Sequence, residues 1–330
     1  MCLYSRKLTL LLTLLLFMSL VFSSCTGIIP SETTSITDGT HDTSRLNMVD
    51  ERFELLALIW RLAERQEYSE KATDYQKELE TAFAEFKSHP AVQFVREQLP
   101  YTGYDAVFKY AVHLTQGDEG YELVSDLDSL LEARWTDDNV RSFLVLLNDF
   151  NLATDFHSFY KDHTALYIKE TKLFVDQAYG KVNMEWITSQ SALKDFRCIL
   201  SLSSGNYGAL VNDTIAYACI KHKSELTIVH EFCHRFGNPL AIEWYQNAPT
   251  FQQLCDDSVD LERYPQYNHG LAMAFEYMAK AYVILYRFDQ DQRMSDRITM
   301  LFIFAEEKKQ GFTHIEEVFN MLLEYEKSPQ

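Results

Sequence analysis

Apolar side chains recur three or four residues apart through much of the chain that follows the N-terminal segment, and this spacing predicts helices. In the first of these helices Phe53, Leu56 and Trp60 share one side. The same spacing recurs in DAVFKYAVHL, residues 105–114, and in TDDNVRSFLVLL, residues 136–147. We therefore expect the N-terminal half of the folded protein to be all-helical.

Between residues 196 and 220 the pattern changes to a period of two, which is typical of half-buried strands. FRCILSLSS alternates apolar and polar residues, GNYG supplies turn residues, and DTIAYACI predicts a second short strand. Helical spacing then resumes and continues towards the C-terminus. The pattern predicts an α+β fold that is mostly α, with a helical N-terminal region followed by a small antiparallel sheet and further helices.

The N-terminus has the composition of an export signal. Two basic residues precede an uncharged apolar run over residues 8–22, which is short for a membrane span, and two serines and Cys25 follow. This ending resembles the lipobox of bacterial lipoproteins, and the resemblance implies that Cys25 is lipidated and anchors the protein to a membrane. A plain secretory peptide with an incidental cysteine is the alternative. In both cases we expect an exported protein. If Cys25 is lipidated, we expect the protein to be anchored to a membrane of the cell envelope.

Charge and cysteine content narrow the possible partners. The formal net charge of −18 argues against nucleic acid and anionic lipid headgroups as partners. Cys198, Cys219, Cys233 and Cys255 form an even set in a compartment that permits disulfides. Three pairings of these four are possible, and the sequence does not choose among them.

The motif His230-Glu231-x-x-His234 carries the candidate chemistry. Residues four apart lie on one face of a helix, so the two imidazoles can bind one metal ion. Glu231 is turned by about 100° around the helix axis and lies near the metal without binding it. From there it can act as general base on a zinc-bound water, which suits hydrolysis of a peptide or related amide. The alternative is an amphipathic helix that carries two surface histidines.

A third metal ligand must come from elsewhere in the chain. Position 240 is Leu240, which excludes the class with a third histidine six residues beyond the second. We expect Asn238-Pro239 to end the helix, with Gly237 able to turn the chain. Glu276 is a better candidate, because a carboxylate in so apolar a helical segment costs several kcal/mol unless it is compensated. The alternative is an exposed ion pair between Glu276 and Lys280. Three nearer carboxylates lie in polar, loop-like sequence and rank lower: Asp256, Asp257 and Glu262.

These residues resemble the gluzincin, thermolysin-like zinc metallopeptidases, in which two histidines and a glutamate from a downstream helix bind zinc. The resemblance implies His230, His234 and Glu276 as Zn²⁺ ligands and Glu231 as general base. HEFCHRFGNPL with the upstream GNYG also resembles a family of uncharacterised bacterial lipoproteins with a predicted metallopeptidase domain.

The gluzincin resemblance further implies how a substrate is held. The edge strand around residues 203–210 is expected to pair with an extended peptide. A histidine or tyrosine stabilises the oxyanion in this group, and His269 and Tyr207 are the two candidates for that role. A histidine at a helix start is also a common helix cap.

Together these features predict four segments and a function. The segments are a signal peptide over residues 1–24, a flexible tether over 25–47, a helical region over 48–180 and a zincin-like catalytic region over 181–330. The expected function is peptide-bond hydrolysis by an exported, lipid-anchored zinc metallopeptidase that acts on a peptide or protein. The alternative is a non-catalytic surface lipoprotein that binds protein or glycan and keeps a vestigial or structural zinc site.

Overall fold

The computed structural model describes thirteen stretches of the chain, all within one compact unit, Asp42–Gln330. These stretches are residues 48–68, 73–99, 102–103, 105–124, 127, 134–191, 196–205, 208–211, 215–219, 224–260, 262, 269–291 and 297–327. The expected signal peptide and tether, with Cys25, and also Tyr207, lie outside them.

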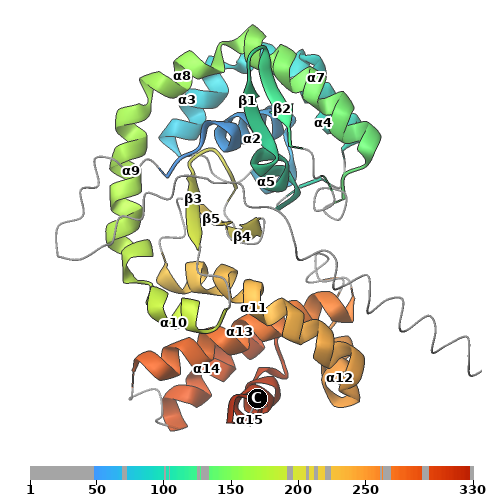
Figure 1. Ribbon diagram of the computed structural model, residues 1–330, viewed down its shortest axis with the longest axis vertical. Coiled ribbons are helices and arrows are strands. Elements are labelled where there is room, and N and C mark those ends of the chain that lie inside the picture. The colour runs from blue at the N-terminus through green and yellow to red at the C-terminus, as the bar shows by residue number, and fades with distance from the viewer. Residues whose placement is uncertain are drawn as a thin grey trace, which may run out of the picture. The chain divides into compact units, whose positions relative to one another are not determined.

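The described chain is mostly helical, which confirms the predicted fold class (Figure 1). None of the described helices is both long enough and apolar enough to cross a bilayer. Short 3₁₀ helices span Gln66–Tyr68, Ala84–Ser88 and Tyr179–Lys181. The α-helices are α2 (Glu51–Leu62), α3 (Asp74–Ala82), α4 (Pro90–Gln98), α5 (Asp105–Val112), α7 (Asp137–Thr154), α8 (Phe156–Asp162), α9 (Thr164–Gln177), α10 (Met184–Ser189), α11 (Glu225–Asn247), α12 (Pro249–Asp256), α13 (Gly270–Gln290), α14 (Arg297–Lys309) and α15 (Ile315–Lys327).

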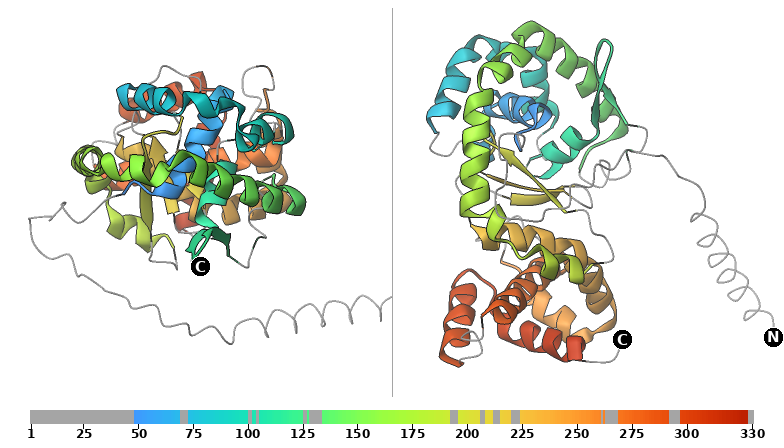
Figure 2. Two further views of the ribbon diagram at one scale, coloured as in Figure 1. Left: turned by 90° about the horizontal axis from the view of Figure 1, so that it is seen from above. Right: turned by 60° about the vertical axis from the view of Figure 1, so that its left-hand side comes forward.

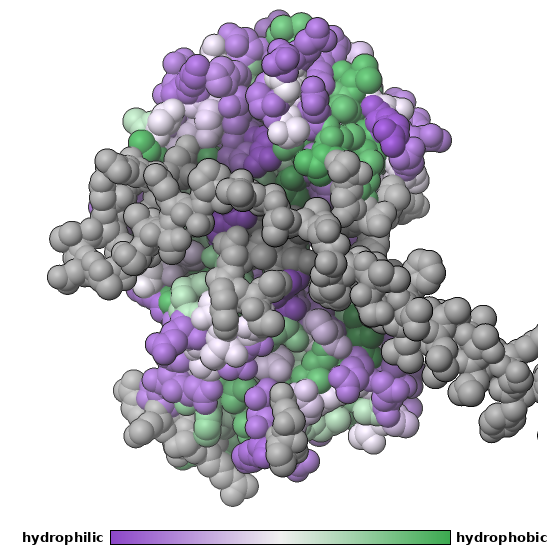
Figure 3. Space-filling view, viewed as in Figure 1, coloured by the Kyte–Doolittle hydropathy of each residue, from purple (hydrophilic) through white to green (hydrophobic). Residues whose placement is uncertain are grey.

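The first helical group forms around α2, which is capped by the Asp50 side chain and is buried from Phe53 to its end. Trp60 packs edge-to-face on Phe143 of α7, with ring centroids 5.4 Å apart. These residues belong to a buried cluster built from residues 53–156. A second buried cluster takes most of its members from residues 167–322, and it contains the inner faces of α11 and α13. The described surface in Figure 3 mixes hydrophilic and hydrophobic residues, and hydrophilic ones cover much of the upper helices.

The expectation of an all-helical first half is wrong at one place. Strands β1 (Leu114–Gly117) and β2 (Gly120–Leu123) form an antiparallel hairpin there. Gly120 adopts a φ of +133°, a backbone conformation that glycine reaches without steric cost. The segment LTQGDEGYEL therefore turns back on itself where helical spacing had ended.

The predicted sheet forms from β3 (Arg197–Ser201), β4 (Gly208–Val211) and β5 (Ile215–Cys219) in the order β3-β5-β4. β4 pairs antiparallel with β5 as expected, but β3 runs parallel to β5, so the sheet is mixed. The alternation of apolar and polar residues could not decide this, because parallel and antiparallel strands share the same period of two. Figures 1 and 2 show the three strands between α2 and α5 on one side and α11 on the other.

Helix α11 is longer than the sequence indicated. We expected Asn238-Pro239 to end the helix and Gly237 to turn the chain, yet the helix continues to Asn247 with Pro239 inside it. Gly237 serves packing instead. A Cβ atom there would lie 3.2 Å from Cγ of Met278 and 3.4 Å from the Tyr282 ring, both on α13. The missing side chain therefore lets α11 and α13 approach closely.

A buried carboxylate joins the first helical group to the sheet. Glu54 of α2 is fully buried, and its oxygens accept hydrogen bonds from the Ser201 and Tyr75 hydroxyls and from the backbone N–H groups of Leu202 and Ser203. Burial raises the pKa of this carboxyl, and the hydrogen bonds oppose the rise. Four donors converge on the two carboxylate oxygens, so the side chain at position 54 must provide two hydrogen-bond acceptors.

We expect Glu54→Gln to lower the free energy of unfolding by about 1–3 kcal/mol. The NH₂ group of the glutamine would face one of the buried donors, and that donor would be left without an acceptor. Equilibrium urea unfolding followed by circular dichroism measures the loss. Glu97→Gln on the exposed face of α4 is the matched control and should change stability little. Equal stability of the two variants would contradict the role given to Glu54.

Candidate metal centre

Helix α11 presents the histidine pair on one face and carries apolar residues on the others. Ile228, Val229, Phe232 and Cys233 are buried in the second cluster, which anchors the helix on both sides of the motif. The rings of His230 and His234 lie with centroids 4.8 Å apart and nearly perpendicular planes. Both are partly exposed, so the pair borders accessible space.

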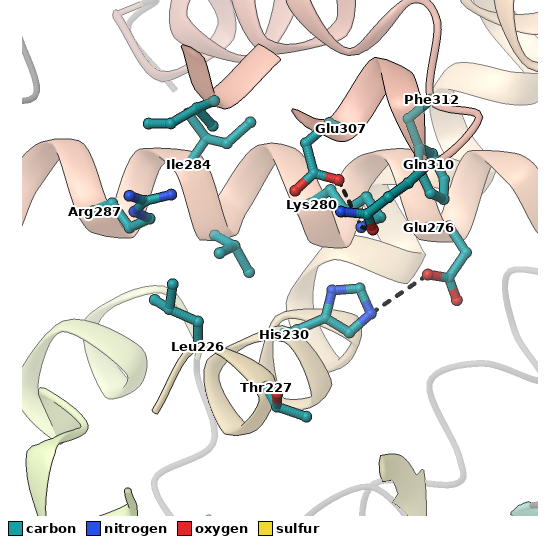
Figure 4. A pocket seen from close by; sticks show the side chains of 12 residues that line it. Leu226, Thr227, His230, Glu276, Lys280, Ile284, Arg287, Glu307, Gln310 and Phe312 are labelled. Atoms are coloured by element: carbon teal, nitrogen blue, oxygen red, sulfur yellow. Dashed lines mark hydrogen bonds and ion pairs between the residues drawn. The ribbon is translucent and has the colours of Figure 1, made fainter. Parts of the chain in front are cut away.

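Glu276 reaches this pair from α13. Its Oε2 lies 3.4 Å from Nε2 of His230 (Figure 4). Its Oε1 lies 3.7 Å from Nε2 of His234. One ligand atom from each of the three residues lies within 4.8 Å of the others. Among the residues that the structure describes, no further Cys, His, Asp or Glu joins this group.

The donor set and its spacing fit zinc. Two imidazole nitrogens and one carboxylate oxygen are a common ligand set of catalytic zinc sites. Bonds of about 2.0–2.1 Å in a tetrahedral site separate neighbouring ligand atoms by about 3.3–3.4 Å. The 3.4 Å and 3.7 Å separations from Glu276 to the two histidines are close to that value. All three ligand atoms lie within 4.8 Å of one another, so the three side chains could hold zinc if they move closer together, and would leave a coordination position free of protein.

Charges around Glu276 favour its ionised form. Burial alone would raise its pKa, but the hydrogen bond from His230 and the charges of His234, His230 and Lys280 outweigh burial and lower the pKa to about 2. Lys280 does not form the ion pair with Glu276 that we considered as an alternative. Its Nζ lies 2.7 Å from Oε2 of Glu307 on α14. The carboxylate is thus left facing the two histidines.

Asn238 orients one of the histidines and was missed in the sequence. Its Oδ1 lies 3.0 Å from Nδ1 of His234. With the amide oxygen as acceptor, this contact favours the tautomer in which Nδ1 carries the proton and Nε2 is left to bind a metal. Residue 238 lies four positions after His234 and shares its helix face, but the expected end of the helix at Asn238-Pro239 concealed this relation.

Glu231 is buried between the histidine helix and the sheet. Burial raises its pKa to about 7, the charge of Glu276 adds to the rise, and the charge of His234 with a hydrogen bond from the Leu210 backbone opposes it. The amide N–H of Leu210 therefore points away from β5 and towards Glu231. β4 is the outermost strand of the described sheet, and its outer edge therefore lies beside Glu231.

A cavity of about 410 Å³ adjoins the centre. His230 and Glu276 form part of its wall, and the rest comes from the first turn of α11, one face of α13, α14 and the loop after α14 (Figure 4). Its other lining residues are Leu226, Thr227, Lys280, Val283, Ile284, Arg287, Ile303, Glu307, Gln310 and Phe312. The centre therefore opens onto a space large enough for part of a peptide.

The remaining candidates that the structure describes do not belong to the His–His–Glu group. His269 is exposed and caps α13, where its Nδ1 accepts a hydrogen bond from the Ala272 backbone, so the structure shows it in the capping role. As an oxyanion ligand it stays a prediction, as does Tyr207. Three carboxylates do not belong to the ligand group: Asp256, Asp257 and Glu262.

The described cysteines are free thiols. Cys198, Cys233 and Cys255 are buried and form no disulfide with one another. Burial raises the pKa of each of them, which disfavours the thiolate that binds metals. Cys233 therefore acts as a small core residue although it stands between the two histidines. The side chain of Cys219 lies outside the described part.

Comparison with known proteins found no counterpart: no family model, no curated protein and no solved structure matches this chain.

We expect Glu276→Gln to weaken zinc binding by more than about 100-fold. Loss of a residue that hydrogen-bonds to a metal ligand lowers metal affinity by about 10–100-fold, and loss of the charge of a ligand itself should lower it further. Titration against a chelating dye measures the affinity. Glu307→Gln is the matched control, since that carboxylate lines the same cavity but pairs with Lys280. Unchanged zinc affinity in Glu276→Gln would place the third ligand elsewhere.

Asn238→Ala should weaken zinc binding by about 10–100-fold without abolishing it, because His234 loses the acceptor that holds its ring and tautomer. The same titration detects the change, with Asn247→Ala at the end of α11 as control. An affinity equal to that of the wild type would show that Asn238 does not orient the ligand.

Proposed function

We propose that this protein is a zinc-dependent hydrolase of peptide bonds. The observation that supports it best is a buried glutamate, Glu231, directly beside a His–His–Glu group to which the described chain adds no fourth ligand. Catalytic zinc sites keep one position free of protein ligands, whereas structural sites are closed by four. The adjoining cavity gives a substrate access to the group.

Each residue has a distinct task in this proposal. His230, His234 and Glu276 hold the metal, and Asn238 keeps His234 in the tautomer that binds. Zinc, when bound, supplies a Lewis acid that polarises the substrate carbonyl and makes water a stronger nucleophile near neutral pH. Glu231 accepts the proton that the attacking water loses and then donates it to the leaving amine.

The sheet edge offers a place for the substrate backbone. β4 is the last strand of the described sheet, and the Leu210 amide at its open edge faces Glu231. An extended peptide that pairs with such an edge aligns its main chain with the strand, and its side chains alternate between the two faces. Pairing along β4 would bring the scissile bond beside the general base.

Export and anchoring belong to the same proposal. The apolar segment before Cys25 supports secretion, and lipidation at Cys25 would hold the enzyme at a membrane of the cell envelope. A surface lipoprotein with only a structural zinc site is less well supported, because within the described residues the group lacks the fourth protein ligand that such sites have.

Glu231→Gln should keep zinc but lower peptide cleavage by a factor of about 10²–10⁴, the usual contribution of a general base. Zinc content by mass spectrometry and cleavage of a fluorogenic peptide library, with and without a chelator, test both parts. Glu243→Gln on the exposed side of α11 is the control and should retain activity. Full activity in Glu231→Gln would refute the proposed role.

A further inference from the structure

One face of α13 forms a wall of the cavity beside the metal centre. Glu276, Lys280, Ile284 and Arg287 follow one another along it, at spacings of four, four and three residues. The α-carbons of Glu276 and Arg287 are eleven positions apart, which corresponds to about 16 Å along a helix. Arg287 therefore lies at the opposite end of the cavity from the His–His–Glu group (Figure 4).

The other charges that line the cavity are compensated. Glu276 faces the two histidines. The Lys280 ammonium group is paired with Glu307 and lies 4.4 Å from the ring centroid of Phe312. These groups hold α13, α14 and the following loop together, so their charges serve the structure of the cavity wall.

The Arg287 guanidinium differs from them. Within the part of the chain that the structure describes, it donates no hydrogen bond and has no carboxylate within ion-pair distance. Two nearby acidic side chains accept hydrogen bonds from other residues. Glu225 accepts a hydrogen bond from the Tyr286 hydroxyl, and Asp289 accepts one from the Trp186 indole. Of the charged side chains that line the cavity, Arg287 is therefore the one for which the described chain provides no partner.

Apolar side chains surround the approach to this guanidinium. Leu226 of α11, Val283 and Ile284 of α13, and Ile303 of α14 line the cavity. Arg287 is a half-buried residue in a cavity with aliphatic walls, and such a site suits a carboxylate. The planar guanidinium donates two parallel hydrogen bonds, and the apolar walls strengthen the attraction. The neighbouring walls suit the aliphatic part of the group that carries the carboxylate.

We infer that the cavity is a substrate subsite and that Arg287 binds a carboxylate of the peptide, several residues from the bond that is cleaved. The inference rests on the proposed peptidase function and names its substrate class: peptides with an acidic side chain or a free C-terminus at that distance. Arg287 is a specificity-determining residue in this assignment and takes no part in the chemical step.

Binding to the Glu231→Gln protein loaded with zinc tests this inference without relying on cleavage. Three sets of fluorescein-labelled peptides are compared by anisotropy. The first set carries a single Glu at successive positions with an amidated C-terminus. In the second set Gln replaces the Glu, and the peptides end in a free C-terminus at successive lengths. In the third set Gln replaces the Glu and the C-terminus is amidated, so the peptides carry neither carboxylate. Preference for the first or the second set over the third identifies the source of the carboxylate.

We expect at least one carboxylate set to bind about 10–100-fold more tightly than the neutral set, as expected for a hydrogen bond to a charged group. When Arg287→Gln is combined with Glu231→Gln, the preference for the carboxylate peptides should disappear. Arg287→Lys in the same background should keep part of that preference. Arg141→Gln, on the exposed face of α7 where Arg141 pairs with Asp137, is the matched control. Rising salt should weaken the preference in the parent protein.

Thermal unfolding of each variant shows whether it is folded. If Arg287→Gln does not fold, the comparison with Arg287→Lys still tests the inference. Equal affinity for the three sets, absence of peptide binding, or a preference that survives in Arg287→Gln would overturn the inference. A preference that depends on Arg287, together with a wild-type protein that cleaves no peptide, would instead refute the peptidase proposal and leave the carboxylate site standing.

Discussion

The candidate site depends on the close packing of α11 against α13. The two histidines share one helix, so their proximity is local, but Glu276 meets them only because the second helix approaches closely. Gly237 permits that approach, since a side chain there would press on Met278 and Tyr282. The contact also solves an electrostatic problem, because a carboxylate in an apolar helix needs a compensating charge or metal. Packing and charge compensation therefore favour the same arrangement of the two helices.

Charge compensation also separates structural groups from binding groups in this molecule. The Glu54 carboxylate is surrounded by donors and joins α2 to the sheet, and Lys280 with Glu307 joins α13 to α14. Each of these groups has its partner within the fold. Arg287 is different, because the described chain leaves its guanidinium without a hydrogen-bond or ion-pair partner. Glu231 is intermediate: it is buried beside the His–His–Glu group, and its carboxyl accepts a hydrogen bond from the Leu210 backbone. Groups of this kind are the ones that a substrate can engage.

Sequence periodicity was a good guide to element type and a poor guide to element ends and directions. The helical spacing around Phe53 and the alternation in FRCILSLSS both correspond to elements of the predicted kind. Asn238-Pro239 misled us, because a proline removes one hydrogen bond but a helix packed along its length against α13 can continue through it. The parallel pairing of β3 and β5 was equally hidden, since strand direction depends on the path of the chain between strands.

What the sequence determined by itself is local: the fold class, the helix that carries His230 and His234 on one face, and the isolation of Glu276 among apolar residues. These follow from spacings of a few positions and from residue type. Only the tertiary structure decided that Glu276 faces the histidines while Lys280 turns to Glu307, that Leu210 donates to Glu231, and that Arg287 ends the cavity. Such meetings join residues far apart in the chain, and they depend on how whole helices and strands pack, which no short pattern encodes.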